Sequence, residues 1–138
     1  MIVLDSSFIV AFHNERDAHH GAARGLMERF LEGEWGRGLL LEYVVLEVAT
    51  VMLLRRNLAV ASAVARLLLT AAELDFVACS DLFAGAFERF AKQRDTHLSF
   101  VDTAIAQVAE ERAGGLVLTF DKELSRVASL HVPAVMQT

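Results

Sequence analysis

After Met1 the chain runs Ile2-Val3-Leu4-Asp5-Ser6-Ser7, so that three aliphatic residues lead directly into an acid and two hydroxyl residues. The aliphatic run predicts a short strand over 2–4. Asp5-Ser6-Ser7 consists of residue types that begin helices, and it predicts a helix through Phe12. A strand that passes straight into a helix is typical of parallel α/β sheets, and this segment therefore suggests the fold class.

The remainder of the chain repeats this alternation of short apolar runs and helical spacing. Apolar runs predict strands at 39–41, 76–78, 116–119 and 131–135. Helical spacing predicts helices at 20–31, 42–56, 58–72, 81–92, 100–112 and 121–129. The pattern predicts one α/β domain over residues 1–138, a three-layer sandwich with a central parallel sheet and helices on both faces.

Composition restricts the classes of protein that remain. Of the 138 residues 54% are hydrophobic, and 18 acids against 13 bases give a net charge of −5. The apolar content excludes a disordered chain and exceeds what a core of this size needs. We therefore expect a fully buried sheet, a subunit interface or both, with the helices at 42–56 and 58–72 buried on several faces. The acidic balance offers no bulk positive charge to a nucleic acid.

Cellular location is predicted from the cysteine count and from the longest apolar stretch. The single Cys79 excludes an internal disulfide and a multi-cysteine metal site, and we expect it to be a small core residue. The apolar stretch 39–54 contains two acids and is followed by two arginines, so no membrane span is expected. No secretory signal precedes the first strand, and the chain is predicted to be cytoplasmic.

Four acids occupy places where an acid is unusual. Asp5 and Asp121 each follow a predicted strand, so in a parallel sheet both lie at the same carboxyl edge. Glu47 and Asp102 are the lone charges of two apolar helical stretches, with no basic residue one helical turn away. A buried carboxylate takes up a proton, finds a cation or binds a metal. Several of them without enough Lys or Arg favour a divalent ion, and oxygen ligands suit Mg²⁺ or Mn²⁺.

Each of these acids also has a purely structural interpretation. Asp5 and Asp121 both precede predicted helices, where Asp is a favoured N-cap residue. Glu47 and Asp102 can be protonated core acids or partners of a distant base. Glu42 is predicted to be a solvated acid at a helix start, with a role at the rim of the site as the alternative. The adjacent His19 and His20 diverge on a helix, so they are predicted to be surface or helix-start residues and not metal ligands.

The four acids and their surroundings resemble the PIN-domain ribonucleases, in particular the VapC-type toxins of toxin-antitoxin pairs. The resemblance covers Ile2 to about Val135 and is carried by an ordered set of motifs. The segments that carry it are residues 2–11, Asp17-Ala18-His19-His20, Leu46-Glu47-Val48-Ala49, residues 98–104 and Leu118-Thr119-Phe120-Asp121-Lys122. The chain departs from the family at Glu42, where relatives often carry a small hydroxyl residue.

The resemblance implies a PIN-like, Rossmann-like sheet and a Mg²⁺-dependent endoribonuclease that leaves a 5′-phosphate and a 3′-hydroxyl. It makes Asp5 and Asp102 the direct metal ligands, with Glu47 and Asp121 completing the catalytic set. Thr119 is implied as a supporting hydroxyl, and Ser7 as a residue that orients Asp5 or caps the helix. The candidates for contacts to the RNA backbone are the basic residues Arg55, Arg56, Arg112, Lys122 and Arg126, although each is predicted first to be an ordinary solvated charge at a helix end.

Partners follow from the same resemblance. A cognate antitoxin is expected to block the acidic pocket with an inserted Arg or Lys. The apolar surplus predicts a homodimer and an apolar groove for an antitoxin helix, with 26–31 and 53–69 as candidate surfaces. Two alternatives stay open: a PIN-type nuclease of RNA processing or decay without an antitoxin, and a catalytically silent PIN binding module. A phospho-acceptor receiver domain is disfavoured, because it needs a pair of acids where this chain has Asp5 and Ser6.

Overall fold

A four-stranded parallel sheet forms the centre of the computed structural model, which describes residues 1–134. Its strands are β1 (Ile2–Leu4), β2 (Gly38–Leu41), β3 (Leu74–Val77) and β4 (Val117–Leu118). They lie in the order β3-β2-β1-β4, with Val3 paired to Leu39 on one side and to Val117 on the other. Strands β1 and β2 are buried along their whole length, as expected of a sheet covered on both faces.

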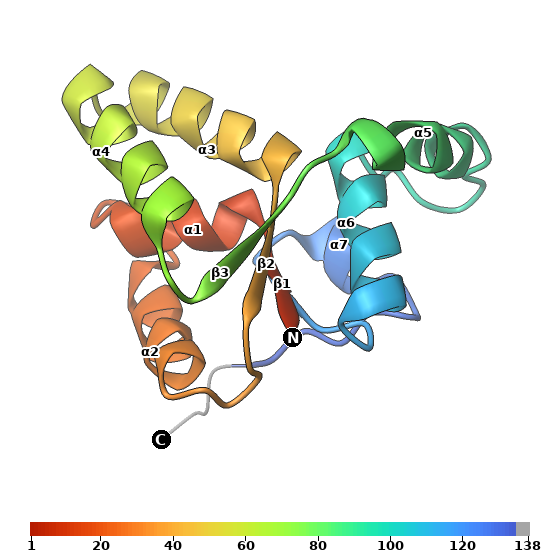
Figure 1. Cartoon of the computed structure of the whole chain (residues 1–138), viewed down its shortest axis with the longest axis horizontal. Coiled ribbons are helices and arrows are strands. Elements are labelled where there is room, and N and C mark those ends of the chain that lie inside the picture. The colour runs from red at the N-terminus through yellow and green to blue at the C-terminus, as the bar shows by residue number, and fades with distance from the viewer. Residues whose placement is uncertain (135–138) are drawn as a thin grey trace.

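Helices cover both faces of this sheet, as the sequence predicts (Figure 1). On one side lie α1 (Ser6–His13), α2 (His20–Leu31), α3 (Glu42–Arg55) and α4 (Leu58–Thr70). On the other side lie α5 (Phe83–Ala91), α6 (Phe100–Arg112) and α7 (Lys122–Ser125), and a 3₁₀ turn, Ser80–Leu82, precedes α5. The predicted α/β three-layer architecture is confirmed.

Close packing around β2 explains why a glycine begins this strand. A Cβ placed on Gly38 would lie 2.6 Å from a side-chain atom of Leu74 and 2.8 Å from one of Phe30. The helix behind the sheet is equally tight, since the side chains from Thr103 to Ala106 in α6 are fully buried. The close-packed core therefore holds the ends of β1 and β2 in fixed positions. The residues that directly follow these strands are held in place as well.

Strand order determines where a site can form. From β1 the chain moves to β2 and β3 on one side, and it returns to β4 on the other side of β1. The direction of the connections therefore changes between β1 and β4. In open α/β sheets ligands bind at the carboxyl ends of the strands beside such a switch point. Asp5 directly follows β1, and Asp121 follows β4 with two residues between.

The C-terminal segment differs from the prediction. The helix expected over 121–129 is the four-residue α7, because the chain turns at Arg126 instead of continuing. The strand expected over 131–135 is an isolated parallel bridge between Leu116 and His131, and 132–134 are irregular. Residue 135, the last of that predicted strand, lies outside the described residues.

The exposure of side chains on α3 and α4 differs from the prediction. We expected the helices at 42–56 and 58–72 to be buried on several faces, yet large side chains of α3 and α4 lie in solvent, with Leu54 at 79% and Leu58 at 67% exposure. Likewise the predicted strand residue Phe76 is exposed, because β3 is at the edge of the sheet. The apolar surplus of the sequence is therefore largely on the surface of this chain. Among the described helices, none is long and apolar enough to cross a membrane.

Candidate active site

Asp5 stands at the N-cap position of α1, but its side chain does not cap the helix. The carboxylate instead accepts two hydrogen bonds at Oδ2, one from Ser7 Oγ and one from Thr119 Oγ1, each 2.7 Å long. Asp5 is 3% exposed, so these two hydroxyls fix a nearly buried carboxylate. The structural interpretation of Asp5 as a side-chain cap is therefore wrong.

The same two hydroxyls connect β4 to α1. Ser7 Oγ accepts a hydrogen bond of 2.9 Å from the backbone N–H of Phe120, and Thr119 Oγ1 accepts one of 2.9 Å from that of Asp121. Each hydroxyl thus accepts from the backbone after β4 and donates to Asp5. The end of β4 is positioned against the start of α1 by this network at the switch point of the sheet.

Asp121 does cap a helix. Its Oδ1 accepts hydrogen bonds from the backbone N–H groups of Glu123 and Leu124, at 2.8 and 3.1 Å. The capping interpretation is therefore confirmed for Asp121. A cap that uses one oxygen leaves the carboxylate charge in place, so Asp121 still contributes to the electrostatic field of the neighbouring acids.

Glu47 lies on α3, which begins immediately after β2, and its side chain is half-buried. Its pKa is raised from 4.5 to about 7, mainly by burial and also by the negative charges of Asp5, Asp102 and Asp121, while the Ser6 hydroxyl opposes the shift. A carboxylate whose pKa responds to three other acids lies within electrostatic reach of all of them.

Asp102 occupies the third position of α6 and belongs to a capping box. Its backbone N–H donates to Ser99 Oγ at 3.1 Å, and its Oδ2 accepts from the backbone N–H of Ser99 at 3.3 Å. Burial raises the pKa of Asp102 to about 6, with Asp5 and Asp121 adding to the shift and Ser99 opposing it. Ser99 was not recognised in the sequence, although Ser three residues before an acid is a capping-box pattern.

The structure therefore brings all four predicted acids into one electrostatically coupled site. None of them forms an ion pair with a described residue. Within residues 1–134, however, no three His, Cys, Asp or Glu side chains are arranged closely enough to hold a metal ion as they stand. To hold a cation together, these side chains would have to rotate inward from the positions that they occupy here. A hard dication fits this set by the chemistry of its oxygen donors and by its missing counter-charge.

Glu42 and Cys79 contact each other. Glu42 Oε1 accepts a hydrogen bond of 2.9 Å from the backbone N–H of Cys79, so Glu42 holds the start of the 3₁₀ turn and is not simply a solvated helix-start acid. Cys79 is buried, and burial raises the pKa of its thiol. A neutral buried thiol is a core residue and not a nucleophile, as predicted.

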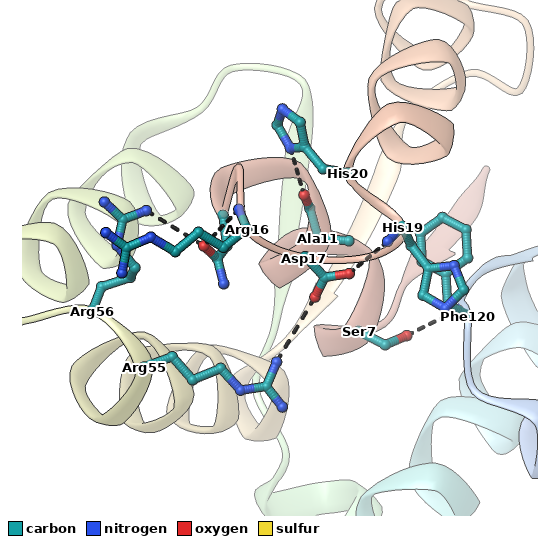
Figure 2. A network of polar contacts seen from close by, with 10 residues as sticks. Ser7, Ala11, Arg16, Asp17, His19, His20, Arg55, Arg56 and Phe120 are labelled. Carbon is teal, nitrogen blue, oxygen red and sulfur yellow. Dashed lines mark hydrogen bonds and ion pairs between the residues drawn. The ribbon is translucent and has the colours of Figure 1, made fainter.

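A pocket beside Asp5 contains residues whose arrangement the sequence does not reveal (Figure 2). It measures about 250 Å³ and is lined by Ser6, Ser7, Val10, Asp17, His19, Val51, Arg55 and Phe120. His19 stacks on Phe120, and Arg55 faces Asp17. His19 does lie exposed at a helix start, as expected, and the neighbouring His20 points away and bonds the carbonyl of Ala11 at 2.8 Å.

Comparison with known proteins agrees with this geometry. The family model of the PIN domain matches residues 2–130, and the chain therefore belongs to the PIN domain family. A comparison of the sequence with curated proteins finds no match.

Solved structures place the fold more finely. The VapC20 toxin of Mycobacterium tuberculosis, described as cleaving the Sarcin-Ricin loop, is similar with a TM-score of 0.80 and 25% identity, over 93% of this chain and 95% of that one. VapBC2 of Rickettsia felis, solved with a DNA fragment from its promoter, is similar with a TM-score of 0.64 and 15% identity, over 96% of this chain and 98% of that one. The fold is thus that of VapC-type PIN proteins.

Proposed function

We propose that this chain is a Mg²⁺-dependent endoribonuclease and the toxin of a toxin-antitoxin pair. The observation that carries the proposal is the buried Asp5 carboxylate, fixed by two hydroxyls at the switch point and coupled to three further acids without a basic partner. Such a site concentrates negative charge, and no described basic side chain forms an ion pair with it. Membership of the PIN domain family and likeness to an RNA-cleaving toxin support the choice of RNA as substrate.

Two residues, Asp5 and Asp102, would hold the ion. When bound, it would lower the pKa of the attacking water and stabilise negative charge on the phosphodiester. Ser7 and Thr119 keep Asp5 in one orientation, because both donate to Oδ2. Glu47 and Asp121 complete the negative field that retains the ion. Hydrolysis of this kind would leave a 5′-phosphate and a 3′-hydroxyl.

An apolar groove supports an antitoxin as partner. A pocket of about 230 Å³ lies between α2 and α4, and Met27, Phe30 and Leu31 face Leu67 and Leu68 across it. These residues fall in the two segments that the sequence singles out as candidate surfaces. An amphipathic helix with apolar residues at helical spacing fits such a groove. The likeness to VapBC2 supports a partner of this type.

A second apolar surface supports the proposed homodimer. Phe83, Phe87 and Phe90 form one stripe along α5 and are each at least 41% exposed. Aromatic rings exposed in this number are typical of protein interfaces. A second copy of the chain is the proposed occupant, and mass measurement of the protein with and without Phe87→Lys tests it.

The decisive experiment is cleavage of single-stranded RNA by the purified protein with Mg²⁺ or Mn²⁺, compared with EDTA. Asp5→Asn and Asp102→Asn keep the shape of each side chain and remove its charge. We expect a loss of at least 100-fold in rate for either variant, while Asp95→Asn, an exposed acid of the loop before α6, leaves the rate unchanged.

The alternatives give different results. A silent binding module shows no cleavage that depends on metal or on Asp5. A processing nuclease cleaves RNA but binds no small partner encoded beside it, and Leu67→Lys in the groove then has no binding to abolish. Equal activity in EDTA and Mg²⁺ would contradict the proposed mechanism.

A further inference from the structure

The pocket beside Asp5 is small and combines aromatic, hydroxyl and charged side chains. Its volume of about 250 Å³ falls below the usual range for drug-sized ligands. Ser7 belongs to both this pocket and the Asp5 network, since its Oγ bonds Asp5 and the backbone of Phe120. A group bound here would therefore be close to the Asp5 carboxylate, which Ser7 contacts.

An aromatic stack forms one wall of the pocket. The rings of His19 and Phe120 are parallel within 5° and their centroids lie 4.5 Å apart. Phe120 is half-buried and also lies against Phe8, whereas His19 is exposed. The free end of this stack is therefore the outer face of the His19 ring, on which a further planar ring can continue the stack.

A basic side chain faces the same space with a weak partner. Arg55 Nη1 lies 3.8 Å from Asp17 Oδ2, and 59% of the Arg55 side chain is exposed. An exposed ion pair at this distance contributes little to stability, so Arg55 can turn to a phosphate at small cost. Asp17 is held more firmly, because its Oδ1 accepts a hydrogen bond of 2.8 Å from the backbone N–H of His19.

We propose that this pocket binds one unstacked RNA base next to the cleaved phosphodiester, with the base on the His19 ring and a flanking phosphate on Arg55. The proposal rests on the proposed function, and it assigns roles in substrate binding to His19 and Arg55 that the acidic site does not require. The stack recognises the π-face that every base has. The pocket therefore selects for an unpaired nucleotide and does not select for a particular base.

The test measures binding without cleavage. The Asp102→Asn protein is titrated with hexauridylate and with a hexamer of abasic ribose phosphate that carries the same charge. Introducing His19→Ala should weaken binding of hexauridylate about tenfold and leave the abasic hexamer unaffected, because stacking needs a base. His19→Phe should restore the affinity, since it keeps an aromatic ring. His97→Ala, an exposed histidine of the loop before α6, is the matched control.

The proposed contact between Arg55 and a phosphate predicts a different pattern of binding to the two hexamers. Arg55→Gln should weaken binding of both hexamers equally, because the phosphate is common to them, whereas Arg66→Gln on the exposed side of α4 should weaken neither. In proton NMR spectra of the histidine side chains, the ring-proton signals of His19 should move upfield when hexauridylate is added and not when the abasic hexamer is added.

Several outcomes would overturn the proposal. They are equal loss for both hexamers in His19→Ala, failure of His19→Phe to restore binding, and no binding of hexauridylate at all. Cleavage by the wild-type protein in Mg²⁺ is a separate readout. A protein that cleaves RNA but shows no dependence on His19 refutes the base pocket alone, and one that binds through His19 without cleaving refutes the nuclease alone.

Discussion

Thr119 Oγ1 donates a hydrogen bond of 2.7 Å to Asp5 Oδ2, and the two residues are 114 positions apart in the sequence. Ser7 Oγ donates to the same oxygen at the same distance. The orientation of Asp5 is therefore set by two hydroxyls. One is two residues away in the sequence, and the other is distant in the sequence but adjacent in the fold.

We expect Thr119→Val to lower the cleavage rate about tenfold, because it removes one hydrogen bond to the carboxylate while keeping the volume of the side chain. Its cost in stability should be about 1–3 kcal/mol, since Asp121 N–H and Asp5 each lose a partner. Thr70→Val is the matched control, because its hydroxyl bonds carbonyls in α4. Full activity in folded Thr119→Val protein would show that Thr119 does not position Asp5.

Asp121 allows its capping role to be separated from its charge. Asp121→Asn keeps an oxygen for the N–H groups of Glu123 and Leu124, so stability should change little while cleavage falls. Asp121→Ala removes the cap as well and should cost about 1 kcal/mol more. Rates and urea unfolding of both variants test this. An Asn variant with wild-type activity would leave Asp121 as a helix cap alone.

The raised pKa of Glu47 predicts how stability depends on pH in the absence of metal. Between pH 4.5 and about pH 7, Glu47 holds a proton in the folded protein that it has released in the unfolded chain. The contribution of this group is therefore complete below pH 4.5 and is lost as the pH rises through 7. Glu47→Gln should gain stability relative to wild type between pH 5 and 8 in EDTA. A difference independent of pH would contradict the coupling.

Mg²⁺ should reverse this loss, because it binds deprotonated carboxylates of the folded state. At pH 8 and about 100 times its dissociation constant, the ion should add about 2.7 kcal/mol and raise the Tm by several degrees. At pH 5.5, below the pKa values of about 6 and 7 for Asp102 and Glu47, the increase should be much smaller. Asp5→Asn should abolish the increase at both pH values, and a persistent increase would place the ion elsewhere.

Gly38 gives a prediction about the fold alone. Gly38→Ala forces a methyl group into contact with Leu74 and Phe30 and should destabilise the protein by about 1–3 kcal/mol. Gly25→Ala, where nothing lies within 4 Å of the added carbon, should instead stabilise α2 by about 1 kcal/mol. Denaturant unfolding compares the two, and equal effects would contradict the packing described around β2.

Local pattern was enough to predict most of the sheet and helices, because apolar runs and helical spacing report burial directly. It failed where the chain is held by single contacts. The predicted strand at 131–135 is a bridge at His131, since one paired residue leaves no periodic pattern. Phe76 looks like a core residue in the sequence, and its exposure depends on β3 being an edge strand.

The candidate site likewise has features that local sequence predicts and features that depend on the tertiary fold. The four acids could be selected from the sequence because an unpaired charge in an apolar stretch is conspicuous. The stack of His19 on Phe120 could not, since the two residues belong to different motifs and their contact depends on the tertiary fold. That the Asp5 side chain does not cap α1 likewise needed coordinates, because an Asp before a helix start has the same sequence pattern whether or not it caps.

The contact between Asp5 and Thr119 also has a consequence for the order in which the site forms during synthesis. Synthesis proceeds from the N-terminus, so Asp5 leaves the ribosome long before Thr119. Until then the carboxylate lacks the hydroxyl that comes from β4, and α7 with Asp121 does not yet exist. Under the proposed function, a nascent chain is unable to cut RNA until residues 119–121 have been made and have folded against β1.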